Sequence, residues 1–479
     1  MPELTTFSEA GKWLSERFYD GTDHTVREIG FIGAGSYSFD DRYLIDVSVR
    51  ESGSSVFGRD NRWGCFWSAG AGWNIHNEPF MDSAPWLSML KLRASTGVTG
   101  TQAFNPYQAR ARYIYLDYLY DNRYGALLSG LPNDALSWQK IHDTDIGIDA
   151  GIGRWLNLKF DYFQQTTDNM LSDITLAPSC GFSSFKANLG QMRNRGFEIS
   201  ASFTPWRDDA ADGWFTLSAS AMHNDNRLTR ISNLLETFNK SQNRAKTLPL
   251  QITDREMTRS DYEADRLIKT TPSALYSEGC STTAIWGVRS AGVDPLTGRR
   301  IFIDRNGDIT YTWNADDQVI IGDLAPDVSG NITLSGGWKG LSAAISLSYS
   351  LGGDIYNTTL VNKVENVTGY DNLDRRILDS WQNVGDKAPY RKLTITTSDK
   401  MEYTLPNSSF VTRNNELVCN SLNIGYEFGR LHCIKSMGFD RLKISVYAND
   451  LFRMSTVKCE RGTSYPYARN YSLSIQASF

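Results

Sequence analysis

The chain has 479 residues, of which 41% are hydrophobic and 22% charged, and this balance excludes both a minimal domain and a disordered chain. The formal net charge of −5 and the pI near 5.7 argue against a nucleic-acid-binding protein, which usually carries a basic surface. No window approaches the roughly 18 consecutive apolar residues of a transmembrane helix, and the mean hydropathy is −0.39.

The first residues, Met1-Pro2-Glu3-Leu4, lack the basic and apolar regions of a signal peptide. We expect two parts: an irregular N-terminal segment, residues 1–28, and a β-rich portion, residues 29–479. The cysteines at 65, 180, 280, 419, 433 and 459 show no CxxC spacing and no histidine at zinc-finger distance. We expect these cysteines to be unpaired.

From Ile29 onward, apolar and polar residues alternate with a period of two, which is the pattern of a strand with one apolar face. Asp40-Asp41 marks the first tight turn of a β-hairpin. The same reading predicts thirteen strands, at about 29–38, 43–49, 63–73, 90–96, 144–150, 155–166, 197–203, 215–221, 332–336, 341–351, 417–428, 442–448 and 471–479.

The last of these strands has the clearest pattern. Its apolar positions, from Tyr471 to Phe479, alternate with serines and one glutamine rather than with charged residues. Small polar residues on one face and an aromatic C-terminal residue on the other fit a transmembrane β-barrel, in which lipid-facing and interior residues alternate. Taken alone, this segment also fits the final strand of a soluble sandwich.

The connections between the predicted strands alternate in length. Residues 99–142, 227–327 and 352–412 are long, whereas 40–41, 151–154 and 338–340 are short. Outer-membrane barrels place long loops outside and short turns on the periplasmic side, while a sandwich has no reason to separate them. We therefore predict an all-β fold, an antiparallel transmembrane β-barrel with long loops at one end and short turns at the other.

The barrel interpretation also predicts which way the side chains face. The apolar members of the strands should point outward and the polar members inward. The outward set includes Tyr43, Ile45, Val47, Phe197, Ile199, Leu473 and Ile475, and the inward set includes Asp46, Ser48, Glu198, Ser200 and Ser474.

Several motifs resemble SusC/RagA-type TonB-dependent outer-membrane transporters. They run from about residue 30 to the end of the chain, and together they are specific. The motifs are Asp41-Arg42-Tyr43-Leu44, Val49-Arg50-Glu51-Ser52-Gly53-Ser54-Ser55-Val56-Phe57-Gly58, Asn61-Arg62-Trp63-Gly64, Trp73-Asn74-Ile75-His76-Asn77-Glu78-Pro79-Phe80, Leu90-Lys91-Leu92-Arg93-Ala94-Ser95, Asn194-Arg195-Gly196-Phe197-Glu198, Gly352-Gly353-Asp354-Ile355-Tyr356-Asn357 and Asn449-Asp450-Leu451-Phe452.

The resemblance implies a barrel of 22 strands with an N-terminal plug, located in the outer membrane and importing glycans or peptides. It also implies two partners, TonB and a SusD-like surface lipoprotein that closes over the extracellular loops. The plug, the TonB box and the earlier strands have no counterpart in this sequence. We therefore expect the C-terminal portion of such a barrel, with TonB acting only through the missing N-terminal region.

A count of thirteen strands has a consequence for closure. Because successive strands run antiparallel, the first and the thirteenth point the same way, whereas bacterial barrels usually contain an even number of strands. We expect an open, curved sheet with free edges at 29–38 and 471–479, or a poorly packed parallel closure.

One segment, Asp304-Arg305-Asn306-Gly307-Asp308, is a candidate calcium loop because its alternate residues carry side-chain oxygens. An EF-hand-like loop needs glycine at the sixth position and an acidic ligand at the twelfth, and these positions hold Ile309 and Ala315. We therefore prefer a turn between two short strands, and expect neither a metal nor another cofactor.

Catalysis is not expected. The histidines, at 24, 76, 142, 223 and 432, lie outside the usual nucleophile and metalloprotease motifs. An alternative function is a soluble or surface β-rich carbohydrate-binding protein without transport activity, for which residues 113–120, rich in tyrosine, would be a stacking surface. We prefer an extracellular hairpin for this run, and we predict a short amphipathic helix at 373–384. No substrate-binding residue can be assigned from the sequence.

Overall fold

The computed structural model describes residues 25–478 except 103–105, 108, 121–122, 176–183, 189, 209, 211, 232, 248–258, 368–372, 394–402, 429–440 and 458–468. The predictions for residues 1–24, His24, Cys180, His432, Cys433, Cys459 and Phe479 lie outside these residues. No helix in the described part is long and apolar enough to cross a membrane.

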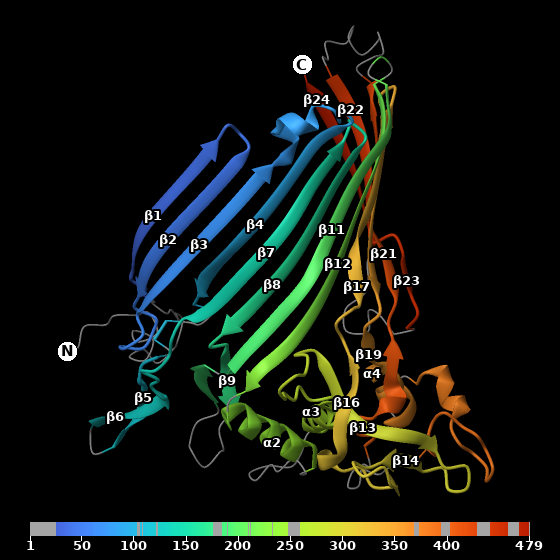
Figure 1. Ribbon diagram of the computed structural model, residues 1–479. Helices are drawn as coiled ribbons and strands as arrows, with labels where there is room; N and C mark the ends of the chain where they lie inside the picture. Colours follow the sequence, from blue (N-terminus) through green and yellow to red (C-terminus); the bar gives the residue numbers. More distant parts are fainter. Residues whose placement is uncertain are drawn as a thin grey trace.

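One large antiparallel sheet dominates the structure (Figure 1). Its strands follow each other in chain order, without a crossover, and β23 (Arg453–Ser455) pairs with β21 beside this path. The path consists of β1 (Glu28–Phe39), β2 (Tyr43–Ser54), β3 (Trp63–Asn74), β4 (Leu87–Thr101), β7 (Gln139–Ile152), β8 (Leu156–Asp168), β11 (Gly190–Asp208), β12 (Gly213–Ile231), β17 (Val328–Trp338), β18 (Leu341–Leu351), β21 (Glu416–Glu427), β22 (Arg441–Asn449) and β24 (Asn470–Ser478).

These strands correspond one to one to the thirteen predicted from the alternation, which confirms the fold class. Most of them extend beyond the predicted bounds, because polar residues continue the pairing past the apolar stretch. β11, for example, begins seven residues before Phe197, the first residue of the predicted strand.

The short turns and the long loops lie at opposite ends of the sheet, as predicted (Figure 1). Asp40 and Asp41 both have positive φ, at 51° and 50°, and the N–H of Arg42 donates to the carbonyl of Phe39. This is the backbone of a type I′ turn, whose twist matches that of a hairpin. Lys339 and Gly340 make a second turn with positive φ at both central residues.

The long loops contain folded elements of their own. They include the hairpins β5 (Arg112–Tyr120)–β6 (Arg123–Gly130) and β9 (Leu171–Thr175)–β10 (Ser184–Asn188), and the helices α2 (Asn233–Thr247) and α3 (Arg259–Thr270). A small sheet has the order β15 (Ile309–Thr310), β14 (Arg300–Ile303), β13 (Ala284–Val293), β16 (Gln318–Asp323), and β19 (Asp354–Tyr356) pairs with β20 (Val411–Arg413). Short helical turns complete them: η4 (Ala315–Asp317), α4 (Thr358–Leu360), η5 (Val361–Glu365), η6 (Arg375–Asp379) and η7 (Ser408–Phe410). Two further helical turns, η1 (Ile75–Asn77) and η2 (Pro79–Met81), lie instead in the connection between β3 and β4, at the end of the short turns.

The predicted amphipathic helix at 373–384 is wrong. Only the five-residue 3-10 helix η6 forms there, with Leu373, Leu378 and Val384 exposed. The chain turns again directly afterwards, because the carboxylate of Asp386 accepts hydrogen bonds from the N–H groups of Gln382 and Asn383.

The packed apolar cores lie toward the loops and not along the sheet. One cluster joins Ile285, Tyr356, Val361 and Phe410. By contrast, six apolar residues of the sheet are 40–65% exposed, namely Tyr43, Ile45, Val47, Ile199, Leu473 and Ile475. Exposed apolar side chains of this number require an apolar solvent or a covering partner.

Candidate functional site: the polar face and the loop end of the sheet

The register of the sheet collects exposed and half-buried apolar residues into one belt. Ile45 and Val47 of β2 pair with Ala71 and Ala69 of β3, and residues of like character pair in the same way to the far edge, where Ile444 pairs with Ile475. Between these edges the belt includes Ile146, Ile148, Phe160, Tyr162, Phe197, Ile199, Ile332, Leu334, Ile345, Leu422, Ile424 and Val446. The predicted outward set therefore shares one face of the sheet.

Aromatic residues border this belt on the side of the short turns. Tyr43, Trp155, Trp206 and Trp338 all lie within a few residues of such a turn, and all are 43–52% exposed. A girdle of exposed aromatic rings at the edge of an apolar band is a feature of membrane barrels, in which it sits at the level of the lipid headgroups.

The opposite face is polar and partly charged. Arg93 of β4 makes ion pairs with Asp149 of β7 at 3.3 Å and with Asp161 of β8 at 2.5 Å. Ser48 and Ser68 share a hydrogen bond of 2.7 Å between β2 and β3. Such a face suits a water-filled interior, because its side chains hydrogen bond to each other and to water.

Two of the sequence motifs meet at the turn end of β2 and β3. The hydroxyl of Tyr43 donates to Glu78 at 2.8 Å, and the indole N–H of Trp73 donates to the same oxygen at 3.0 Å. The hydrogen bonds from Trp73 and Tyr43 hold the pKa of the Glu78 carboxyl below its usual value. The side-chain amides of Asn74 and Asn77 both donate to the carbonyl of Asp41. These residues thus fix the turns to one another.

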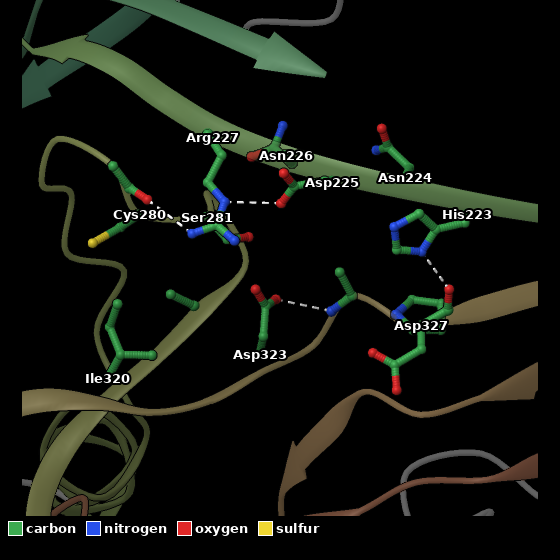
Figure 2. A pocket seen from close by; sticks show the side chains of 14 residues that line it. His223, Asn224, Asp225, Asn226, Arg227, Cys280, Ser281, Ile320, Asp323 and Asp327 are labelled. Carbon is green, nitrogen blue, oxygen red and sulfur yellow. Dashed lines mark hydrogen bonds and ion pairs between the residues drawn. The ribbon is translucent and has the colours of Figure 1, made fainter. Parts of the chain in front are cut away.

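A cavity of about 460 Å³ lies at the loop end, where β12 extends past the start of β17 (Figure 2). The His223 ring of β12 donates from Nδ1 to the carbonyl of Asp327, just before β17, at 2.6 Å. This hydrogen bond joins two of the segments that line the cavity. Arg227 closes the far side, with Nε 2.8 Å from Asp225 and Nη1 3.1 Å from the carbonyl of Gly279. The lining is mainly polar side chains from three separate segments of the chain.

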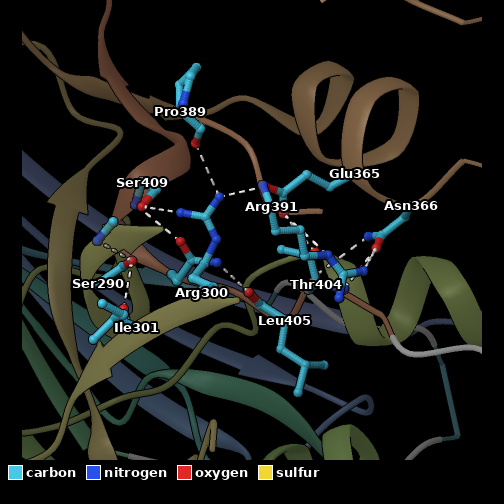
Figure 3. A network of polar contacts seen from close by, with 12 residues as sticks. Ser290, Arg300, Ile301, Glu365, Asn366, Pro389, Arg391, Thr404, Leu405 and Ser409 are labelled. Atoms are coloured by element: carbon cyan, nitrogen blue, oxygen red, sulfur yellow. Dashed lines mark hydrogen bonds and ion pairs between the residues drawn. The ribbon is translucent and has the colours of Figure 1, made fainter. Parts of the chain in front are cut away.

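The two longest loops are joined by a buried ion pair (Figure 3). Arg300 Nη2 lies 2.5 Å from Glu365 Oε1, and the two side chains are 4% and 0% exposed. Glu365 also accepts from the N–H of Arg391 at 2.9 Å and from the Thr404 hydroxyl at 2.8 Å. Arg300 donates to Ser409 at 2.7 Å. These contacts connect the loop between β12 and β17 with the loop between β18 and β21, so the two loops form one unit.

The candidate calcium loop is a hairpin. Phe302 pairs with Thr310 and Ile303 with Ile309, as in the preferred interpretation of the sequence. The carboxylate of Asp304 accepts the N–H of Asp308 at 2.8 Å and so stabilises the turn itself. In the part of the chain that the structure describes, no group of three or more His, Cys, Asp or Glu side chains is placed to hold a metal ion.

The described histidines lie on three different elements, His76 in η1, His142 in β7 and His223 in β12, and have structural partners. His76 contacts the carbonyl of Leu90 at 3.1 Å, and His142 lies 3.2 Å from the Asp168 carboxylate. Neither these two nor His223 hydrogen bonds to a serine or cysteine among the described residues. Cys65, Cys280 and Cys419 are free thiols.

The aromatic run at 113–120 forms strand β5 of the hairpin β5–β6, as preferred from the sequence. Tyr113 and Tyr115 are 64% and 61% exposed. Trp381, placed by sequence in the mispredicted helix, is instead buried and donates to the carbonyl of Pro295 at 2.9 Å. It therefore packs one long loop on the other.

Comparison with known proteins identifies the family. The model for "TonB dependent receptor-like, beta-barrel" matches residues 5–398. The chain belongs to this family. Its β-strands accordingly form part of an outer-membrane β-barrel, with the apolar belt toward lipid and the polar face toward the interior.

Individual relatives agree with this assignment and with the resemblance to SusC/RagA-type proteins. The chain is 27% identical to TonB-dependent receptor P39 of Formosa agariphila over 90% of this chain and 43% of the relative. It is 26% identical to TonB-dependent receptor SusC of Bacteroides thetaiotaomicron over 87% of this chain and 39% of the relative. The chain thus spans less than half the length of these curated relatives.

The fold is shared with a solved structure, that of the RagAB peptide transporter. The TM-score is 0.74 at 23% sequence identity, and the match covers 95% of this chain and 48% of the other. The thirteen strands on the path of the described sheet and its open edges are consistent with a chain that matches about half of a larger barrel.

Proposed function

We propose that this chain supplies wall and loops to an outer-membrane importer of glycans or peptides that is driven by TonB. The observation that carries the proposal is the two-faced sheet. A continuous apolar belt and a polar face, with the long loops at one end, build a lipid-embedded wall around a polar passage. Family membership adds the class of transporter.

The proposal includes two protein partners. A SusD-like surface lipoprotein would contact the loop end, where the joined loops present a folded surface on the outside. TonB would act through the part of the transporter that corresponds to the region of the relatives not covered by this chain. We assign the chain to the wall of a passage and propose no catalytic role for it; its described histidines contact structural partners.

Uptake by the host bacterium tests this function. A strain that lacks the chain should lose energy-dependent uptake of one nutrient class, measured with labelled pools of short oligosaccharides and short peptides. Restoring the chain should restore uptake, and dissipating the proton gradient should abolish it. Surface binding without uptake, unaffected by the proton gradient, would instead identify a binding protein without transport activity.

A further inference from the structure

A row of side-chain amides crosses the polar face close to the loops. Asn226 of β12 donates to Asn194 of β11 at 2.5 Å, and Asn194 donates to Gln165 of β8 at 3.3 Å. Gln165 in turn donates to the carboxylate of Asp143 of β7 at 2.9 Å. We call these residues the amide row. All the donors run in the same direction, so the hydrogen bonds polarise one another.

The amide row is held in place from the loop side. The backbone N–H and the hydroxyl of Thr282 both donate to Asn226 Oδ1, at 3.0 and 2.8 Å. The register also fixes it, because Asn194 pairs directly with Gln165 and with Asn226. The row spans three strand spacings, or about 14 Å. Its geometry is therefore set before any ligand arrives.

The amide row keeps unused hydrogen-bonding capacity. Each amide nitrogen carries two hydrogens and uses one in the row, so Gln165, Asn194 and Asn226 each retain an N–H. The side chains of all three are partly exposed. Asn224, two residues from Asn226 on the same face, has a buried carbonyl oxygen without a hydrogen-bond partner among the described residues.

An aromatic ring lies directly beside the amide row. Phe163 occupies a polar-face position of β8 and pairs with Gly196 of β11, which pairs with Asn224 of β12. A Cβ at Gly196 would come within 2.9 Å of the Phe163 ring and 1.9 Å of the carbonyl of His223, so only glycine fits there. The Phe163 ring is partly exposed and lies against a strand without a side chain at that point.

The position along the barrel makes this surface accessible from outside. On the opposite face, the last apolar residues of the belt on β7, β8 and β11 are Ile146, Tyr162 and Phe197. The outward residues two positions nearer the loops are polar: Thr144, Gln164 and Arg195. The apolar belt therefore ends at the level of Phe163, and the amide row lies just beyond the edge of the lipid. The cavity at β12 adjoins it, since Asn224 and Asn226 also line that cavity.

We infer that the amide row and Phe163 form a binding site for a neutral, polyhydroxylated ligand, a glycan entering the barrel. Uncharged amides offer a donor and an acceptor to hydroxyl groups, and an aromatic ring offers a face to the C–H surface of a sugar ring. This inference rests on the proposed import function and narrows its substrate class.

The chemistry of the surface favours a glycan over a peptide. An extended peptide gains most from an open sheet edge, and the backbones of β8, β11 and β12 are already paired with one another here. A peptide carboxylate terminus also needs a free cation, and Arg93, below the amide row, is paired with Asp149 and Asp161. The carboxylates at the row are Asp143, which is bonded to Gln165, and Asp145, which pairs with Phe163, and carboxylates accept hydrogen bonds from the hydroxyl groups of a sugar.

The test uses the complete transporter in the outer membrane of its host, with a labelled pool of short neutral hexose oligosaccharides and an equally labelled pool of short peptides. Gln165→Leu removes the centre of the amide row, and Phe163→Ala removes the ring. Gln164→Leu is the matched control, because Gln164 lies on the opposite face of the same strand. Phe163→Tyr keeps an aromatic ring and guards against loss of folding, and surface labelling measures the amount of each variant.

Loss of a neutral hydrogen bond predicts that Gln165→Leu raises the oligosaccharide concentration for half-maximal uptake about three- to tenfold. Phe163→Ala should raise it at least as much, while Gln164→Leu and Phe163→Tyr stay within twofold of wild type, within the usual scatter of about 0.5 kcal/mol for surface changes. Oligosaccharide uptake that is equal in all variants would overturn the site and leave import standing. Uptake of peptides but not of oligosaccharides would overturn the substrate class. If neither pool is taken up, the proposed function and this inference both fail.

Discussion

At the scale of single residues, the buried pair of Arg300 and Glu365 shows why the loops behave as one body. A charge at such a site is tolerated only when it is paired and hydrogen-bonded. Glu365 receives hydrogen bonds from Arg300, from the backbone of Arg391 and from Thr404, and Arg300 stacks at 5.0 Å over the Phe410 ring. The pair therefore belongs to the core of the joined loops.

Glu365→Ala should destabilise the joined loops by about 3–5 kcal/mol, because it leaves the Arg300 charge buried without a partner. Limited proteolysis of outer membranes would report this as cleavage within residues 284–413. The control is Glu427→Ala, which breaks an exposed pair with Arg441 and should cost at most about 1 kcal/mol. If the double variant Arg300→Met with Glu365→Leu cleaves as fast as Glu365→Ala, the charge is not the cause.

The pKa of Asp374, at about 2, predicts a pH dependence of η6. The Arg376 side chain donates to both carboxylate oxygens, and the Arg376 backbone N–H donates to one of them. The pKa in the fold lies below the unfolded value of about 3.9, so the stabilisation is full above that value and is lost as the pH falls through about 2. Hydrogen exchange of η6, corrected for the intrinsic rate, should rise over this range. Asp374→Asn should remove that rise, and an unchanged rise would show that another group is responsible.

At the scale of elements, the strands were predictable and the loops were not. The alternation of a strand depends only on neighbouring residues. The pattern around Ile45 or Ile199 therefore identifies an apolar face without knowledge of distant contacts. The loops depend on contacts between distant residues, such as Arg300 with Glu365, 65 positions apart. The helix predicted at 373–384 failed for this reason, because Trp381 packs on the other loop instead of lining an amphipathic face.

The amide row could be predicted from the sequence only in part. Gln165, Asn194 and Asn226 are visible in the sequence only as polar residues of strands, and the register is needed to place them side by side. Phe163 did carry a local signal, since it is an aromatic residue in phase with the polar positions Asp161 and Gln165. An aromatic residue on the wrong face of a barrel strand is worth examining as a ligand contact.

The two faces of β11 should differ in their tolerance of charge. Ile199→Arg places a guanidinium in the apolar belt and should cost about 2–4 kcal/mol in a bilayer if the residue lies near the midplane. Ser200→Arg, one residue along and on the polar face, should cost little. Urea unfolding of the transporter in lipid vesicles would measure both changes, and equal costs would contradict the assignment of faces.

At the scale of the whole molecule, the described sheet is open. β1 pairs only with β2 and β24 only with β22 in the described residues, and the thirteen strands of the path make these two edges parallel. Unpaired N–H and C=O groups are costly in lipid. The chain covers less than half the length of its curated relatives, so further strands between the two edges would pair them.

Produced by itself, residues 1–479 should therefore fail to give a heat-modifiable, protease-resistant barrel in detergent. The reason is that edges β1 and β24 lack partners. Gel mobility before and after heating, with trypsin protection, measures this. A stable folded band from this chain alone would mean that the two edges close on each other.

One face of this sheet meets lipid, and the other lines a water-filled passage. Single cysteines along β11, in the complete transporter with the six natural cysteines of this chain replaced by serine, test this arrangement most directly. In intact outer membranes, a membrane-impermeant thiol reagent should label Glu198→Cys, Ser200→Cys and Ser202→Cys. A lipid-soluble reagent should label Phe197→Cys, Ile199→Cys and Ala201→Cys, so reactivity should alternate with a period of two. Equal labelling of both sets by the impermeant reagent would contradict the account.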